Sequence, residues 1–126
     1  MNKAILVSRL LLGLIFFVFG LNFWLGFIPV PPPPDGHASA FMGALYLSGF
    51  LTAVKVLEIA GAVALFAKRT ALGLVLLGPV VVNILFYDVF LAQAFNPIAV
   101  LAGALALFLL YTERSRFLPL LTKGAA

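Results

Sequence analysis

Few side chains able to do chemistry are present in this sequence, and most of them lie within apolar runs. The chain has no cysteine and one histidine, His37, which excludes thiol redox chemistry and a credible metal or haem site. No Ser/His/Asp set for hydrolysis and no glycine-rich phosphate loop occur. A small polar group remains that could hydrogen-bond a carbonyl-bearing or anionic ligand. It consists of Asn22, Lys55, Glu58, Asn83, Tyr87 and Asp88.

The composition decides the environment in which these side chains act. Hydrophobic residues make up 64% of the 126 residues and charged residues 10%, whereas an ordinary globular domain carries about 25% charged residues. Eight Lys/Arg and four Asp/Glu residues cannot cover the surface of a soluble protein of this size. We therefore expect neither a soluble enzyme nor a disordered chain, but a protein of the lipid bilayer. The net charge of +4 is spread among apolar runs and does not indicate nucleic-acid binding.

Four apolar segments approach the roughly 20 residues that a helix needs to cross a bilayer. They are about 4–26, 50–67, 71–92 and 97–112. The last three are joined by short connections, and short connections place sequential helices side by side and antiparallel. The sequence therefore predicts an all-α fold, with residues 1–126 forming a single domain built as a transmembrane four-helix bundle.

The distribution of basic residues predicts the orientation of this bundle. Seven of the eight basic residues precede or lie near the start of the first segment, in the second connection or in the tail: Lys3, Arg9, Lys68, Arg69, Arg114, Arg116 and Lys123. The first and third connections contain no Lys or Arg. The positive-inside rule then places both termini in the cytoplasm. We expect a multi-pass protein of the cell membrane, which in a bacterium is the inner membrane.

The first connection is expected to be external and stiff. The run from Pro29 to Pro34 contains five prolines, which fix the backbone in an extended form and remove hydrogen-bond donors. A stiff spacer is favoured over a proline-rich docking motif. Residues 37–47 are predicted to form a short helix in the outer leaflet, with a break at Ser48 and Gly49.

Ionisable groups within a membrane are costly, so they are candidates for function. Counting helical rise from the ends of the predicted spans places Arg9 and Glu58 within reach of each other, and we expect them to form an ion pair. Lys55 lies one turn from Glu58 on the same face. Asn83 lies at a similar depth, beyond Pro79, which is expected to kink the third span.

These depths predict a pocket between the first three spans, in the outer half of the membrane. Its walls would be Asn22, Lys55, Glu58, Asn83, Tyr87 and Asp88. Lys55 would contact the ligand, with Asp88 as its partner when the pocket is empty. The alternative is a set of interhelical polar contacts without a ligand, in which Lys55 extends to the interface and Tyr87 belongs to an aromatic belt.

Three stretches together resemble the DoxX family of small four-span membrane proteins. They are Arg9 to Asn22 in the first span, Lys55 to Gly61 in the second, and Gly78 to Phe86 in the third. Related sequences often carry a histidine after the third stretch, where this chain has Tyr87 and Asp88. The resemblance implies a multi-pass membrane protein. Some members are named as subunits of quinol-linked or thiosulfate-linked oxidoreductases, or are tied to redox-stress complexes.

Four functions follow from these features. The first is an accessory subunit of a membrane redox complex, near a quinone and partner subunits; the chain carries no redox centre, so we do not expect it to be an enzyme on its own. The second is a binding module for a lipid or a small apolar ligand. The third is an assembly factor or scaffold, acting through helix faces, alone or as a homo-oligomer. Transport is the fourth and would require an oligomer.

Overall fold

The computed structural model describes residues 2–125, which form helices and connecting segments without a β-strand. The helices are α1 (Asn2–Leu25), α2 (His37–Ser48), α3 (Phe50–Phe66), α4 (Thr70–Phe86), α5 (Pro97–Thr112) and α6 (Arg114–Phe117). A π-helix, η1 (Tyr87–Ala92), continues α4, and a 3-10 helix, η2 (Leu118–Leu121), continues α6. The predicted all-helical fold is confirmed.

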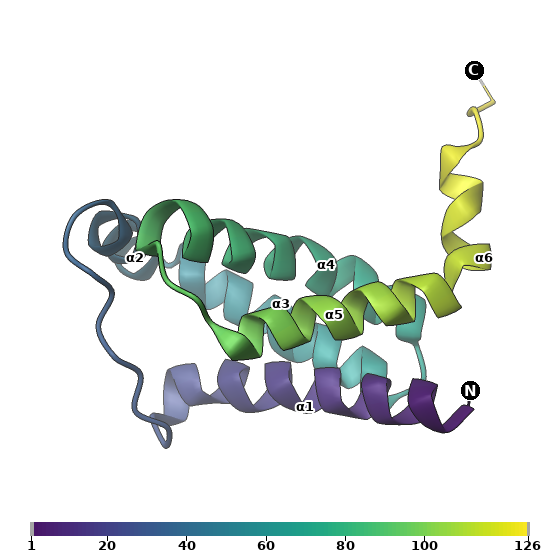
Figure 1. The fold of residues 1–126 in the computed structure, drawn as a ribbon, viewed down its shortest axis with the longest axis horizontal. Coiled ribbons are helices and arrows are strands. Elements are labelled where there is room, and N and C mark those ends of the chain that lie inside the picture. Colours follow the sequence, from purple (N-terminus) through teal and green to yellow (C-terminus); the bar gives the residue numbers. More distant parts are fainter. Residues whose placement is uncertain (1, 126) are drawn as a thin grey trace.

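Four helices, α1, α3, α4 and α5, pack side by side (Figure 1). Helix α1 packs against α3 and α5, and α4 also packs against both, so the four helices form a closed ring. The two ends of the chain and α6 lie at one end of this bundle (Figure 1). Helix α2 and the segment 26–36, which has no helical structure, lie at the other end. We call these the basic end and the α2 end.

Glycines set the register between the helices, because a missing Cβ lets a neighbouring side chain approach closely. A Cβ on Gly61 of α3 would lie 2.5 Å from Cγ of Leu77 in α4, so these two residues are level. A Cβ on Gly20 of α1 would lie 2.8 Å from Cγ1 of Ile59 in α3. The antiparallel α1–α3 and α3–α4 pairs are thereby aligned, and leucines fill the interior between them, with Leu12, Leu65, Leu77 and Leu109 fully buried.

Local signals explain where several helices begin and end. The Asn96 side chain accepts hydrogen bonds from the backbone N–H groups of Ile98 and Ala99 and caps α5, whose first residue is Pro97. Gly49 adopts a left-handed conformation with φ of 85° and separates α2 from α3. The helix and the break expected there are both present. Helix α4 continues through Pro79 without interruption, and the change to π-helical hydrogen bonding comes later, at Tyr87.

Two helical segments are long and apolar enough to cross a membrane, α1 and the continuous segment Thr70–Ala92. Helices α3 and α5 reach that length only together with α2 and with α6–η2, to which they are joined at bends of 82° and 76°. The described residues therefore contain two to four candidate membrane spans. The exterior of the bundle is also apolar: Val75 is 55% exposed and Leu107 is 68% exposed. Such a surface is consistent with a membrane protein.

Candidate functional site

The polar centre of the bundle interior is an ion pair within α3. Glu58 is 3% exposed and lies on the same face of the helix as Ala62 and Leu65, which are also buried. Nζ of Lys55 lies 3.3 Å from each of the two carboxylate oxygens of Glu58. The two residues are three apart in the sequence, so the pair is formed within one helical turn. Two of the predicted site residues are thus in direct contact.

Arg9 does not pair with Glu58, and the predicted ion pair between them is wrong. Nη1 of Arg9 instead donates hydrogen bonds to the backbone carbonyls of Leu65 and Phe66, in the last turn of α3. Leu65 lies seven residues from Glu58, which is about 10 Å along the helix. The error arose from the depth estimate, because α1 extends past the end of α3 and Arg9 lies beside the final turn of α3.

Asn22 has a structural role at the end of α1. Its Nδ2 donates to the carbonyl of Ile28 at 2.9 Å, and its Oδ1 accepts from the N–H of Ile28 at 2.7 Å. Gly26, with φ of 63°, provides the reversal that brings Ile28 back to this side chain. Asn22 is 7% exposed, and its amide fixes the start of the segment 26–36.

Asn83 lies on the exterior of the bundle, so it does not line an interior pocket. Its Nδ2 donates to the carbonyl of Pro79, one turn earlier in α4, at 2.8 Å. The alignment of Gly61 with Leu77 places Asn83 level with Lys55, as the depth estimate predicted. The two side chains nevertheless occupy different faces. The predicted depth of Asn83 is therefore correct, but its side chain lies on the exterior and not in the interior of the bundle.

Tyr87 and Asp88 lie in η1, close to α2. The ring of Tyr87 stacks on that of Phe41 with 5.9 Å between ring centres. Oδ2 of Asp88 is buried and has no hydrogen-bond partner among residues 2–125. No ion pair joins Asp88 to Lys55 in this part of the chain, so the predicted partnership of these two residues is wrong.

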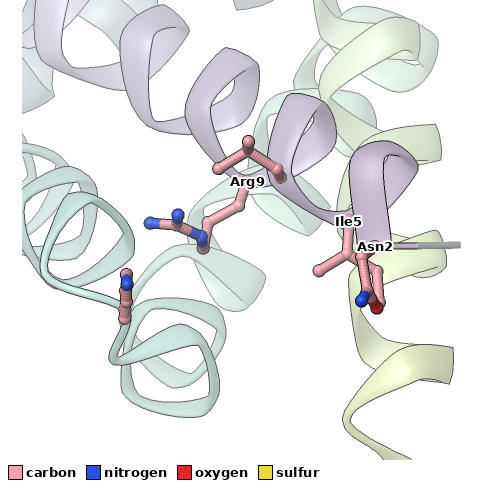
Figure 2. A pocket seen from close by; sticks show the side chains of 5 residues that line it. Asn2, Ile5 and Arg9 are labelled. Carbon is pink, nitrogen blue, oxygen red and sulfur yellow. The ribbon is translucent and has the colours of Figure 1, made fainter.

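Two hollows lie at the basic end of the bundle, away from the predicted pocket. The first, of about 280 Å³, is lined by Asn2, Ile5, Leu6, Arg9 and Lys68. Figure 2 shows Asn2, Ile5 and Arg9 on successive turns of α1, with Arg9 extending away from that helix. The proximity of Arg9 and Lys68 was not predicted from the sequence. Both residues belong to basic segments of the sequence, and this property was used only to predict which side of the membrane these segments face.

Most of the polar side chains of the interior are bound to one another or to backbone groups. The described residues contain no group of His, Cys, Asp and Glu side chains that could hold a metal ion. Lys55 and Glu58 satisfy each other, while Asn22 and the Nη1 group of Arg9 bind backbone groups. No protein-family model, curated protein or solved structure matches this chain.

Proposed function

We propose that the chain is a multi-pass membrane protein that acts as an accessory subunit, and that the exterior face of α4 binds a transmembrane helix of a partner subunit. The observation that carries this proposal is the exposed amide of Asn83 on an otherwise apolar face. Val75, Pro79 and Phe86 are exposed on the same side of α4. In hydrocarbon, a polar side chain on such a face is costly unless another protein covers it.

The α4 face presents more hydrogen-bond acceptors than donors. Oδ1 of Asn83 has no donor among residues 2–125, and its Nδ2 donates one of its two hydrogens to the carbonyl of Pro79. Pro79 has no N–H, so the carbonyl of Val75, four residues earlier, lacks its usual helical donor. Both acceptors lie where lipid tails offer no hydrogen bond. A membrane helix that presents Ser, Thr, Asn, Gln or His side chains would satisfy them.

This surplus of acceptors favours a different protein over a second copy of the chain. In a symmetric dimer the second Nδ2 hydrogen of each Asn83 could satisfy one acceptor of the other copy, and one acceptor of each copy would still lack a donor. A donor-bearing helix of another subunit complements them instead. The resemblance to the DoxX family supplies the class of complex, a membrane redox assembly. The chain has no cysteine and one histidine, so the redox centre and any quinone would be held by the partner subunits.

The proposal includes the orientation of the chain. Lys68, Arg69, Arg114 and Arg116 belong to the basic end, and the segment 26–36 at the α2 end carries no Lys or Arg. The positive-inside rule places the basic end in the cytoplasm. The proline-rich segment and α2 then lie at the opposite surface, with α2 in the outer leaflet.

Site-specific photo-crosslinking tests the α4 proposal. A photoreactive residue at Phe86 should yield an adduct with a different transmembrane protein that is identifiable as a redox-complex subunit. The same probe at Leu14, which is 52% exposed on α1, should not give that adduct. Substitution Asn83→Leu should reduce the yield, and Val100→Leu, at an exposed position of α5, should leave it unchanged. An adduct between two copies of the chain, or equal yields from all the variants, would contradict the proposal.

A further inference from the structure

We infer that the hollow between α1 and the α3–α4 connection binds the phosphate group of an anionic phospholipid. The hollow is lined by two cations, one amide and two apolar side chains: Arg9, Lys68, Asn2, Ile5 and Leu6. It lies at the basic end of the bundle (Figure 2). The inference requires that the chain lies in a membrane, and it does not depend on a partner at α4.

Arg9 is the buried cation of this hollow. The residue is 7% exposed, and its Nη1 is held by the last carbonyls of α3. Its Nε and Nη2 groups have no acceptor among residues 2–125, and neither is fully enclosed by protein. A guanidinium group can present two parallel N–H donors to the oxygens of a phosphate. One side of Arg9 is therefore fixed by α3, while the other carries donors suited to an anion.

Lys68 occupies a backbone position that glycine normally fills. Its N–H binds the carbonyl of Leu65 and the N–H of Arg69 binds the carbonyl of Ala64, which together form a Schellman motif at the end of α3. Lys68 is the left-handed residue of this motif, with φ of 64°. A lysine is less favourable than glycine in that conformation. Lys68 nevertheless lines the hollow together with Arg9.

The electrostatic balance favours this hollow over the neighbouring one. The hollow at Arg9 has no acidic side chain in its lining. The second hollow shares Lys68 and also contains Arg116 and Glu113, whose side chains form an ion pair of 2.9 Å. That carboxylate offsets part of the positive charge. Two unopposed cations make the hollow at Arg9 the better site for a phosphate.

The apolar part of the lining points to a lipid rather than free phosphate. Ile5 and Leu6 lie on α1 beside the cations, and Leu6 is 46% exposed. Leu10, one turn further along α1, is 42% exposed and extends the apolar surface toward the middle of the bundle. Basic pockets between membrane helices at the cytoplasmic interface are suited to anionic headgroups. The acyl chains would lie along α1.

Lipid retention measured by native mass spectrometry tests the inference. The protein is released from nanodiscs containing equal phosphatidylglycerol and phosphatidylcholine, and the bound lipid is counted for the wild type, Lys68→Gly and Lys123→Gly. We expect Lys68→Gly to lower phosphatidylglycerol retention about fivefold, the effect of one basic residue near a membrane surface. Because glycine suits the left-handed position, this variant should unfold at the same or a higher temperature. Lys123→Gly removes the same charge from the tail and should retain the lipid.

Three outcomes would overturn the inference. The first is retention of phosphatidylglycerol by Lys68→Gly at the level of the wild type. The second is an equal loss in Lys123→Gly, which would indicate a general charge effect. Displacement of the lipid by excess inorganic phosphate would assign the site to free phosphate. None of these measurements depends on Asn83, so a failed crosslink at α4 and a failed lipid assay are distinguishable.

Discussion

Lys55 and Glu58 form an ion pair within one turn of α3, with Nζ 3.3 Å from both carboxylate oxygens. The two residues differ in environment, because 4% of the Glu58 side chain and 20% of the Lys55 side chain are exposed. The amine therefore lies between the carboxylate and the bundle exterior. This geometry keeps a negative charge in an apolar interior without a partner from another helix. The pair is a property of α3 alone, formed by residues three apart.

Glu58→Gln should destabilise the bundle, because it leaves the Lys55 amine in a half-buried position without a counter-charge. Removing one partner of a buried pair typically costs about 3–5 kcal/mol. Thermal unfolding in detergent, followed by circular dichroism, measures the change. Glu113→Gln is the matched control, since its partner Arg116 is 71% exposed and ion pairs with a solvent-exposed partner contribute at most about 1 kcal/mol. Equal decreases of the unfolding temperature in the two variants would contradict the role assigned to Glu58.

Arg9→Gln should destabilise the junction of α1 with the end of α3. The substitution removes charged hydrogen bonds to the carbonyls of Leu65 and Phe66, and a bond of this kind contributes about 1.5–3 kcal/mol. Hydrogen exchange of the amides in residues 63–69 should accelerate before that of α5. Arg69→Gln, an exposed residue in the same connection, serves as the control. Slower or unchanged exchange in Arg9→Gln would show that the contact does not stabilise this junction.

Gly61→Ala should loosen the contact between α3 and α4. The added Cβ would lie 2.5 Å from Cγ of Leu77, a buried side chain with little room to move. Overpacking of this kind costs about 1–3 kcal/mol. Gly78→Ala, for which no atom lies within 4 Å of the new Cβ, should leave the unfolding temperature unchanged or raise it. If both variants unfold at the same temperature, the register derived from Gly61 is wrong.

Reporter fusions test the proposed orientation. A reporter that is active only outside the cytoplasm should give a signal when it is inserted at Asp35, in the segment 26–36. A reporter that is active only in the cytoplasm should give a signal when it is fused after Gly124. The expected difference follows from the concentration of Lys and Arg at the basic end. Readings on the same side would mean that the chain crosses the membrane an even number of times between these two positions, which contradicts the proposed orientation.

Helix positions could be predicted from the sequence because they depend on apolar length and on local breaks. The predicted segment 97–112 coincides with α5, whose start is fixed by the Asn96 cap and Pro97. The level of Asn83 relative to Lys55 also followed from counting residues. These properties require only the helical rise and the approximate ends of each segment.

The direction of each side chain could not be predicted in the same way. Apolar residues surround these helices on every side, so the sequence lacks the amphipathic stripe that identifies the buried face of a soluble helix. Asn83 was therefore assigned to the interior although it lies outside. Arg9 was misplaced because its neighbour depends on how far α1 extends past α3. Nothing in the sequence indicated the left-handed conformation of Lys68, because glycine is the residue typical of that position.

The unequal lengths of the helices have a consequence for the bilayer around the protein. Helix α1 has 24 residues and is about 36 Å long, whereas the 17 residues of α3 span about 25 Å. A hydrocarbon core is about 30 Å thick. In the proposed transmembrane arrangement, the bilayer beside α3 and α5 is therefore thinner, or α2 and α6 cover the difference at the interface, while α1 tilts. The bundle is matched to different thicknesses on different sides, which favours a thin or locally deformed membrane.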